Sequence, residues 1–170
     1  MTCELRKWNL LDAKDLAAAL SNTKVQENLR EGLPYPYTEQ DGEDYISAML
    51  SADENETFAF AITVDGKAIG SIAVFRQGNI HRQTGELGYY IAEEYWGKGI
   101  MTEAVRQICQ IVFEKSDIIR IYAEPFAHNM ASCRVLEKAG FQYEGTLRSN
   151  AVKNSKVIDM RMYSLLKGEL

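Results

Sequence analysis

The chain has 170 residues, of which 46% are hydrophobic, and it carries a formal net charge of −5. These values predict a single domain over residues 1–170 with a substantial core, and they argue against a general nucleic-acid-binding surface. The acidic balance mildly favours a cationic partner, although solubility alone explains it equally well.

Simple patterns argue against several further classes of protein. The apolar runs are far shorter than the roughly 20 residues of a membrane span, and the N-terminus lacks the features of a signal peptide, so we expect a cytoplasmic protein. Cys3, Cys109 and Cys133 are widely separated and odd in number, which supports neither a disulfide framework nor a zinc site. His81 and His128 have no partner at metal-binding spacing, so we predict no metal.

In the first third of the chain, hydrophobic spacing predicts a strand over 3–8, a helix over 11–21 and a second helical piece over 24–30. Two prolines stop the helical pattern in the segment 32–37, which we expect to be a loop. Thr38 then has the features of a helix N-cap, and Asp41 stands three residues later in the place of a capping box. This helix is expected to end near residue 50.

The remainder of the chain alternates between strands and helices. Residues 57–64 and 67–75 are strand-like runs joined by Asp65-Gly66, a strong hairpin signal. Further strands are predicted over 86–91 and 119–124, helices from about 100 and 129, and two last strands around Asn154-Ser155. This order predicts an α/β (α+β) fold, in which an antiparallel N-terminal half of a mixed sheet joins a parallel crossover.

The segment 95–105 is the most informative one, because a glycine-rich turn leads there from a strand into a helix. Unpaired N–H groups and the positive end of the helix dipole favour an anion at such a place, and glycines let it approach the backbone. A P-loop is excluded, since the glycines are two apart with Lys98 between them. A dinucleotide-binding fingerprint needs a third glycine where this chain has Thr102. A phosphate or pyrophosphate is the expected ligand.

The turn resembles motif A of the GNAT superfamily of acyl-CoA-dependent N-acetyltransferases, and its Tyr-Trp-Gly-Lys-Gly run is similar to the RimJ/RimL-type branch. Aligned on Gly99, Trp96 and Met101 stand where the general pattern has Gln/Arg and Gly/Ala. Residues 129–141 resemble motif B, Asn-x-x-Ser-x-x-x-x-Glu-Lys-x-Gly-Phe, and the similarity extends through 33–38, 144–148 and 159–163. The resemblance implies a mixed, mostly antiparallel sheet of about seven strands, flanked by helices, with a β-α-β CoA-binding core.

The resemblance also implies a binding site for acetyl-CoA, which would be the cosubstrate. Backbone N–H groups of the turn would bind the pyrophosphate, and an amide near Tyr90 or Ile91 would stabilise the oxyanion. Arg134 and Lys138 could meet the 3′-phosphate, or they could simply belong to a solvated helix face. The residues expected at the cofactor are Tyr90, Ile91, Trp96, Gly97, Lys98, Gly99, Ile100, Met101, Thr102, Asn129 and Ser132.

Two residues are candidates for the chemistry. Glu86 lies on the strand before the turn, where the RimJ/RimL-type pattern Glu-x-Gly-Tyr has its general base; the alternative is an exposed strand glutamate. Ser132 is the candidate acid toward the sulfur, because Leu136 occupies the place of the tyrosine that many GNAT enzymes use. Ser132 could instead satisfy backbone groups at the helix start, and Asn129 could be the N-cap of that helix.

Aromatic residues are candidates for the acceptor-binding wall, namely Tyr35, Tyr37 and Tyr89. For Tyr89, as for Tyr90, core packing is the alternative. The resemblance thus implies an N-acetyltransferase that moves an acetyl group to a primary amine by direct attack in a ternary complex. The amine could be the N-terminus of a peptide or ribosomal protein or a small molecule, with no nucleic-acid or membrane partner, and the enzyme a monomer or a homodimer. The alternatives are a non-catalytic acyl-CoA-binding regulatory module and a protein that binds another nucleotide at the turn.

Overall fold

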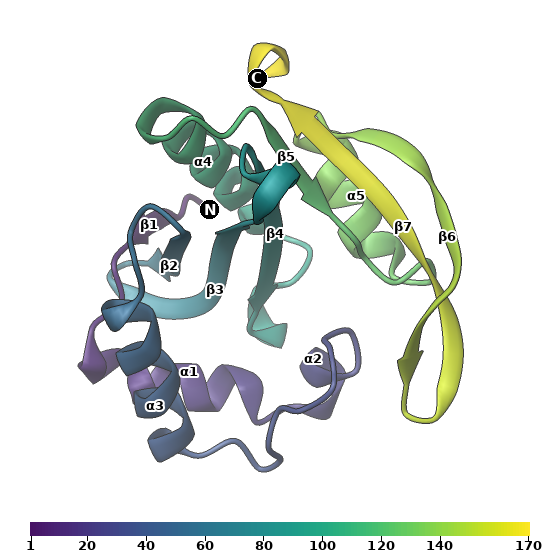
Figure 1. Ribbon diagram of the computed structural model, residues 1–170. Helices are drawn as coiled ribbons and strands as arrows, with labels where there is room; N and C mark the ends of the chain where they lie inside the picture. Colours follow the sequence, from purple (N-terminus) through teal and green to yellow (C-terminus); the bar gives the residue numbers. More distant parts are fainter.

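The computed structural model describes residues 1–170 and contains one sheet with helices on both faces (Figure 1). The strands are β1 (Glu4–Arg6), β2 (Thr57–Val64), β3 (Lys67–Arg76), β4 (Thr84–Ile91), β5 (Arg120–Ala123), β6 (Gln142–Lys153) and β7 (Lys156–Leu166). The α-helices are α1 (Ala13–Leu20), α2 (Thr23–Gln26), α3 (Glu39–Ser51), α4 (Ile100–Lys115) and α5 (Met130–Lys138). Four short 3-10 helices cover Leu10–Asp12, Asn79–His81, Glu93–Tyr95 and Lys167–Glu169.

The seven-stranded sheet has the order β1-β2-β3-β4-β5-β7-β6. All neighbouring pairs are antiparallel except β4 and β5, which α4 joins as a parallel crossover. The parallel pairing runs only from Thr84 opposite Arg120 to Glu86 opposite Tyr122. Beyond it the two strands lose their pairing, while β4 continues to Ile91 along β3. The predicted fold class is therefore confirmed, and the sheet contains a split between its two central strands.

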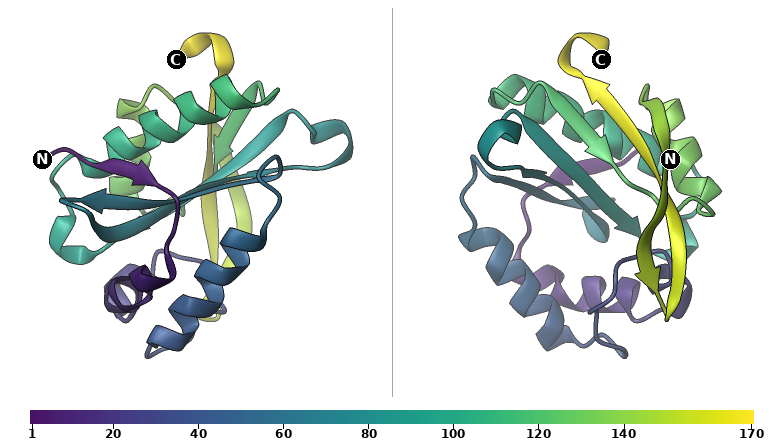
Figure 2. Two further views of the ribbon diagram at one scale, coloured as in Figure 1. Left: turned by 90° about the vertical axis from the view of Figure 1, so that its left-hand side faces the viewer. Right: turned by 45° about the vertical axis from the view of Figure 1, so that its right-hand side comes forward.

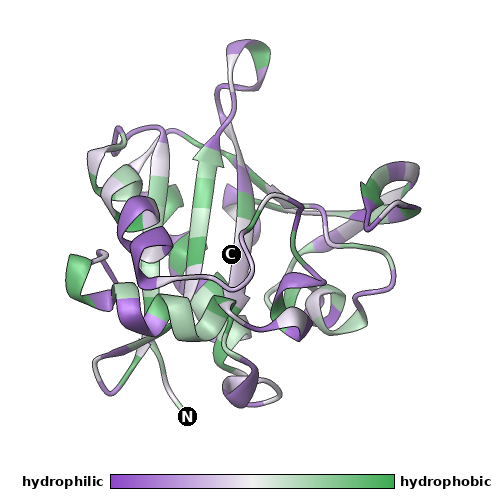
Figure 3. Ribbon diagram, turned by 90° about the horizontal axis from the view of Figure 1, so that it is seen from below, coloured by the Kyte–Doolittle hydropathy of each residue, from purple (hydrophilic) through white to green (hydrophobic).

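The helices form two layers around the sheet. Helices α4 and α5 cover one face, whereas α1, α2 and α3 lie on the other (Figures 1 and 2). In α4 the buried residues recur at helical spacing, as in Ala104, Val105, Ile108 and Val112, and each large apolar side chain buried in this way contributes roughly 1.5–3 kcal/mol. Figure 3 shows apolar residues concentrated on the central strands and polar ones on outer helix faces and loops.

Several local predictions are confirmed. Asp65 and Gly66 both have positive φ, at 50° and 80°, as a tight hairpin requires, and Asn154 and Ser155 form the last turn at 52° and 63°. The Thr38 hydroxyl accepts from the Asp41 N–H while the Asp41 carboxylate accepts from the Thr38 N–H, which completes the capping box.

Other predicted elements are too long. The first strand has only three residues, since only residues 4–6 pair with β2. The second helical piece stops at Gln26 and is followed by turns.

All three cysteines are buried free thiols. No helix combines the length and the apolar character that crossing a bilayer would require.

Candidate active site

The glycine turn presents a row of free backbone amides. Gly97 and Gly99 have φ of 72° and 76°, a left-handed conformation that favours glycine, and no atom lies within 4 Å of a Cβ built on either residue. After Gly97, the first backbone N–H along the turn that forms a hydrogen bond is that of Glu103, which donates to the Gly99 carbonyl at 3.4 Å. The N–H groups of residues 97–102 are therefore unpaired at the positive end of α4, as an anion site requires.

Trp96 departs from its predicted role. Its backbone N–H already donates to the Glu93 carbonyl at 3.0 Å, so this amide is not available to a pyrophosphate. The indole Nε1 donates to the Ile91 carbonyl, also at 3.0 Å, and thereby joins the turn to the end of β4. Nearby, the Lys98 ammonium lies 5.4 Å from the centre of the Tyr95 ring, on the rim of the turn.

The other predicted cofactor residues of the turn lie along it. The side chains of Ile100 and Met101 are buried, so these two residues offer only their backbone. Thr102 is half-buried and lines the same groove as the glycines.

A groove of about 820 Å³ extends from this turn into the split between β4 and β5. The Ala92 N–H donates to the Ile69 carbonyl of β3, and hydrogen bonds alternate along antiparallel strands. The amide of Tyr90 therefore points toward β3, whereas those of Tyr89 and Ile91 point toward the split. Of the two predicted oxyanion donors, only Ile91 has its N–H directed into the groove, and Tyr89 offers a second one.

Glu86 lines the groove on the face of the sheet that carries α1–α3. One carboxylate oxygen accepts a hydrogen bond from the Tyr122 hydroxyl at 2.8 Å, and the other accepts from the Arg30 guanidinium. The Glu86 side chain is 23% exposed and the Arg30 side chain 69%, so Arg30 covers a more sheltered carboxylate. Burial, followed by the bond to Glu86, raises the pKa of Tyr122, which keeps this phenol protonated as the donor.

Glu124 is a second groove carboxylate, which the sequence analysis missed. It follows β5 directly and is two residues from Tyr122, so both side chains are on the same face of the strand. Burial raises the pKa of Glu124, the negative charge of Glu86 adds to this increase, and Arg30 opposes it. Alternation along the predicted strand 119–124 was the available signal for Tyr122 and Glu124. The sequence held no comparable signal for Arg30.

The opposite face of the split carries two hydroxyls. The Tyr89 and Ser132 hydroxyl oxygens are 2.6 Å apart, and Tyr89 packs against the core beneath α4 and α5. Burial raises the pKa of Tyr89 well above its ordinary value. The Asn129 side chain accepts from the Ser132 N–H at 3.2 Å and is the N-cap of α5. The structure thus brings Ser132 and Asn129 together, and it pairs Tyr89 with Ser132.

The predicted tyrosine wall is not assembled as expected. Tyr37 is only 6% exposed, packs with the core of α1 and α3, and donates its hydroxyl to the Asp41 carbonyl at 3.2 Å. Tyr35 is exposed, and neither residue lines the groove. Leu29 and Leu33, from the same segment, line it instead. Tyr90 lines the groove while packing with the α1 and α3 core, and Arg134 and Lys138 lie along the α5 wall.

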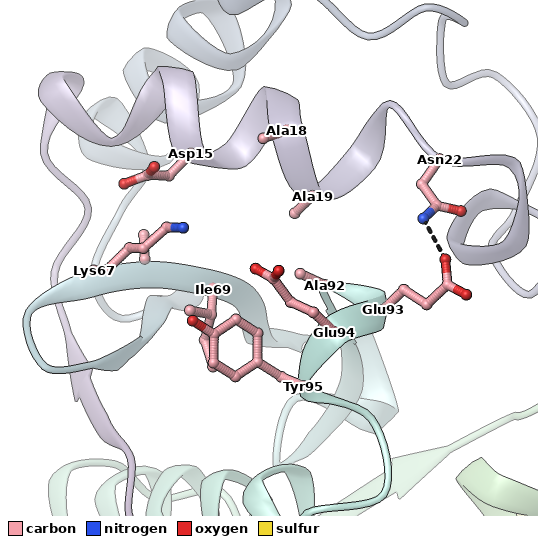
Figure 4. Close-up of a pocket in the computed structure, with 11 residues that line it drawn as sticks. Asp15, Ala18, Ala19, Asn22, Lys67, Ile69, Ala92, Glu93, Glu94 and Tyr95 are labelled. Atoms are coloured by element: carbon pink, nitrogen blue, oxygen red, sulfur yellow. Dashed lines mark hydrogen bonds between the residues drawn. The ribbon is translucent and has the colours of Figure 1, made fainter.

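A second hollow, of about 600 Å³, lies between α1 and β3 (Figure 4). Asp15, Lys67 and Glu94 line it, and the Asn22 side-chain amide donates to Glu93 at 2.8 Å at one end. None of these residues lines the groove of the split strands. The chemistry-bearing groups are therefore concentrated in the larger groove.

Known proteins resemble this chain in sequence and in fold. Residues 3–142 match the family model of the acetyltransferase (GNAT) domain. YdaF of Bacillus subtilis is 31% identical to this chain, over 99% of this chain and 96% of its own length. Its name describes it as a proposed ribosomal N-acetyltransferase. YjcK of Bacillus subtilis, named a probable N-acetyltransferase, is 37% identical over 69% of this chain, and the match spans 65% of that relative.

The fold is shared with Mycobacterium smegmatis RimJ, solved in complex with CoA-disulfide. The TM-score is 0.85 and the identity 20%, over 99% of this chain and 83% of that one. The chain described here belongs to the GNAT family of N-acetyltransferases. The resemblance that its two motifs indicated is thereby confirmed.

Proposed function

We propose that this protein is an acetyl-CoA-dependent N-acetyltransferase that transfers the acetyl group to a primary amine by direct attack in a ternary complex. Residues 1–170 act as one domain in this proposal. Family membership supports acetyl transfer to an amine, and the RimJ relative binds CoA as its disulfide. The observation that carries the proposal is the split between β4 and β5, which joins a row of free amides to carboxylates on one face and hydroxyls on the other.

The free amides of residues 97–102 would hold the pyrophosphate, with the Thr102 hydroxyl and the Lys98 ammonium beside them. Arg134 and Lys138 supply positive charge along the α5 wall for the 3′-phosphate. The amides of Tyr89 and Ile91 face the split, where a thioester carbonyl would accept a hydrogen bond from them. A preorganised donor at the developing oxyanion is commonly worth about 10²–10³ in rate.

The two faces of the split provide the acid and the base. Glu86 and its neighbours are on the face of α1–α3, where the amine would approach, and Ser132 is on the face of α5, toward the sulfur. The amine nitrogen would form a bond to the carbonyl carbon while the carbon–sulfur bond breaks. Overall the nitrogen loses two protons, the sulfur gains one through Ser132, and one is released to water.

The acceptor is an amine that enters as its ammonium ion, because acidic side chains on this face would attract a cation. Leu29, Leu33, Phe126 and Met160 give the groove an apolar wall beside the carboxylates. A peptide N-terminus and a small primary amine both fit this description. The proposed name of the relative YdaF makes a ribosomal protein N-terminus the first candidate to test.

The test is thiol release from acetyl-CoA with a panel of N-terminal peptides, polyamines and aminoglycosides, combined with mass spectrometry of the products. Acceptor-dependent release with a mass gain of one acetyl group would establish the transferase and its substrate class. Tight acetyl-CoA binding without transfer across the panel would contradict this proposal and favour the non-catalytic regulatory module.

A further inference from the structure

The acceptor face of the groove holds two carboxylates with different surroundings. Both oxygens of Glu86 accept hydrogen bonds, one from Tyr122 and one from the cationic Arg30. Glu124 lines the same groove, is only half-buried, and receives no hydrogen bond from the protein. Since β4 and β5 are paired at Glu86 and Tyr122, and Glu124 follows on the same face, the two carboxylates lie beside one another where the strands split.

These surroundings suit the two carboxylates to different tasks. A carboxylate with a guanidinium on one oxygen and a phenol on the other is held in a fixed orientation as an anion, and its lone pairs are partly occupied. A partly desolvated carboxylate without a donor has free lone pairs and a stronger tendency to bind a proton. A general base needs an open oxygen that can reach the proton it removes.

Resting on the proposed function, we infer that Glu124 is a further catalytic residue, which removes the proton from the bound ammonium, whereas Glu86 holds that ammonium beside it. The ammonium transfers one proton to a Glu124 oxygen and becomes the neutral amine. Its lone pair then attacks the thioester carbonyl, and Glu124 passes the proton to water along the open groove. Arg30 and Tyr122 are positioning residues, because they act through Glu86.

The charges around Glu124 support this assignment. Glu86 from β4 and Arg30 from the segment after α2 are the charged groups that act on it, and Tyr122 is the neighbouring titratable group on β5. Burial and Glu86 together raise the pKa of Glu124 more than Arg30 lowers it. A carboxylate with a raised pKa is a better proton acceptor near neutral pH than an ordinary glutamate.

The test compares Glu124→Gln and Glu86→Gln, with Glu94→Gln in the second hollow as the matched control. The measured quantity is kcat/KM for the amine against pH, at saturating acetyl-CoA, for an acceptor found in the panel. Because Glu124 must be ionised to accept a proton, the wild-type rate should fall on the acidic side as Glu124 becomes protonated. Glu124→Gln should lose this acidic limb and about 10²-fold or more in rate.

Glu86→Gln should keep the acidic limb and shift it to lower pH, because the nearby negative charge that raises the pKa of Glu124 is gone. It should also raise the KM for the amine. Both variants should retain the wild-type dissociation constant for acetyl-CoA by calorimetry and a cooperative thermal transition, and Glu94→Gln should match the wild type throughout.

The reverse pattern, in which Glu86→Gln loses the acidic limb, would overturn the inference. Because Glu86→Gln alone gives this answer, the test stands even if Glu124→Gln does not fold. If the wild type transfers acetyl groups and Glu124→Gln keeps the acidic limb of its pH profile, only the role of Glu124 is refuted. A wild type that transfers to no amine would refute the proposed function as well.

Discussion

At the scale of single residues, we propose that the hydroxyl pair of Tyr89 and Ser132 takes the place of a missing acid. Leu136, which is fully buried, occupies the position where many GNAT enzymes have a tyrosine, so it cannot protonate a thiolate. The hydroxyl of Tyr89 comes instead from β4 and contacts Ser132 at 2.6 Å. In this proposal the bond orients the Ser132 hydroxyl, and Tyr89 would return a proton to it after Ser132 has protonated the sulfur.

We expect Ser132→Ala to lower kcat about 10²-fold and Tyr89→Phe to lower it about 10-fold, with the acetyl-CoA dissociation constant unchanged. Both losses should shrink with an acetyl thioester of a more acidic thiol, because such a leaving group needs less protonation. Steady-state rates with both thioesters measure this. Ser47→Ala, on the exposed side of α3, is the control. A loss of the same size with both thioesters would argue against an acid role.

A second residue-scale prediction concerns Asp12, whose side chain is 9% exposed and binds Arg6 through two hydrogen bonds of 2.8 and 2.9 Å. The bonds from Arg6 lower the pKa of Asp12. A carboxyl with a lowered pKa in the folded state stabilises the fold above its unfolded pKa of about 4, and this stabilisation is lost as the pH falls below that value.

Asp12→Asn should therefore lower the free energy of unfolding at pH 7 by about 2 kcal/mol. The difference from the wild type should shrink as the pH falls below about 4. Urea unfolding at a series of pH values measures this, with Asp15→Asn as the control. A difference that stays constant down to pH 2 would contradict the ion-pair explanation.

At the scale of elements, β3 determines where the site-bearing strand β4 can lie. A Cβ on Gly70 would be 2.4 Å from the Tyr90 carbonyl oxygen and 3.0 Å from the Ile91 Cα. These are backbone atoms of the strand end that includes Ile91, whose amide faces the split, so they cannot move aside without moving the strand. Gly70 thus permits the close approach of β3 to β4.

Gly70→Ala should lower the free energy of unfolding by about 1–3 kcal/mol through this overpacking, and it should weaken acetyl-CoA binding at the same time. Thermal unfolding and calorimetry measure the two effects. Gly78→Ala is the matched control, because its added methyl would meet no atom within 4 Å. Unchanged acetyl-CoA affinity in Gly70→Ala would show that the position of β4 is not critical for the groove.

The elements also show how far sequence reasoning reaches. Signals that lie within a few residues of one another were sufficient: Asp65-Gly66 for the hairpin, Thr38 with Asp41 for the helix start, and the glycines for the turn. The hydrogen bonds that Glu86 accepts from Arg30 and from Tyr122 could not be predicted in this way, because they join three separate segments.

The directions in which side chains and backbone N–H groups point could not be predicted from the sequence either. Tyr37 and Tyr90 stand in the expected segments, yet the Tyr37 ring is buried away from the groove and the Tyr90 amide is turned to β3. A tyrosine fits a core and a binding wall equally well, and only the register of a strand decides which of its amides face a neighbour.

At the scale of the whole molecule, the turn between β6 and β7 meets the segment after α2. The Asn154 N–H donates to the Glu31 carboxylate at 2.7 Å, although the two residues are 123 positions apart in the chain. Glu31 also lines the groove and is next to Arg30. This contact connects the hairpin to the segment that positions Glu86.

Glu31→Ala should speed hydrogen exchange of the Asn154 amide about threefold, as expected for the loss of an exposed hydrogen bond worth about 0.5–1 kcal/mol. Glu31→Gln should preserve the protection, because its amide oxygen can still accept the bond. Exchange followed by NMR measures both variants. Equal exchange in Glu31→Ala and the wild type would show that the contact does not persist in solution.

The split between β4 and β5 has a consequence for kinetics. It opens toward α4 and α5 on one side of the sheet and toward α1 and α2 on the other, so two molecules can reach its centre from opposite directions. In the proposed ternary complex, neither molecule would block the path of the other, and we expect no obligatory order of addition. Initial-velocity plots for the two substrates should then intersect, and a CoA product analogue should compete with acetyl-CoA while leaving the amine free to bind.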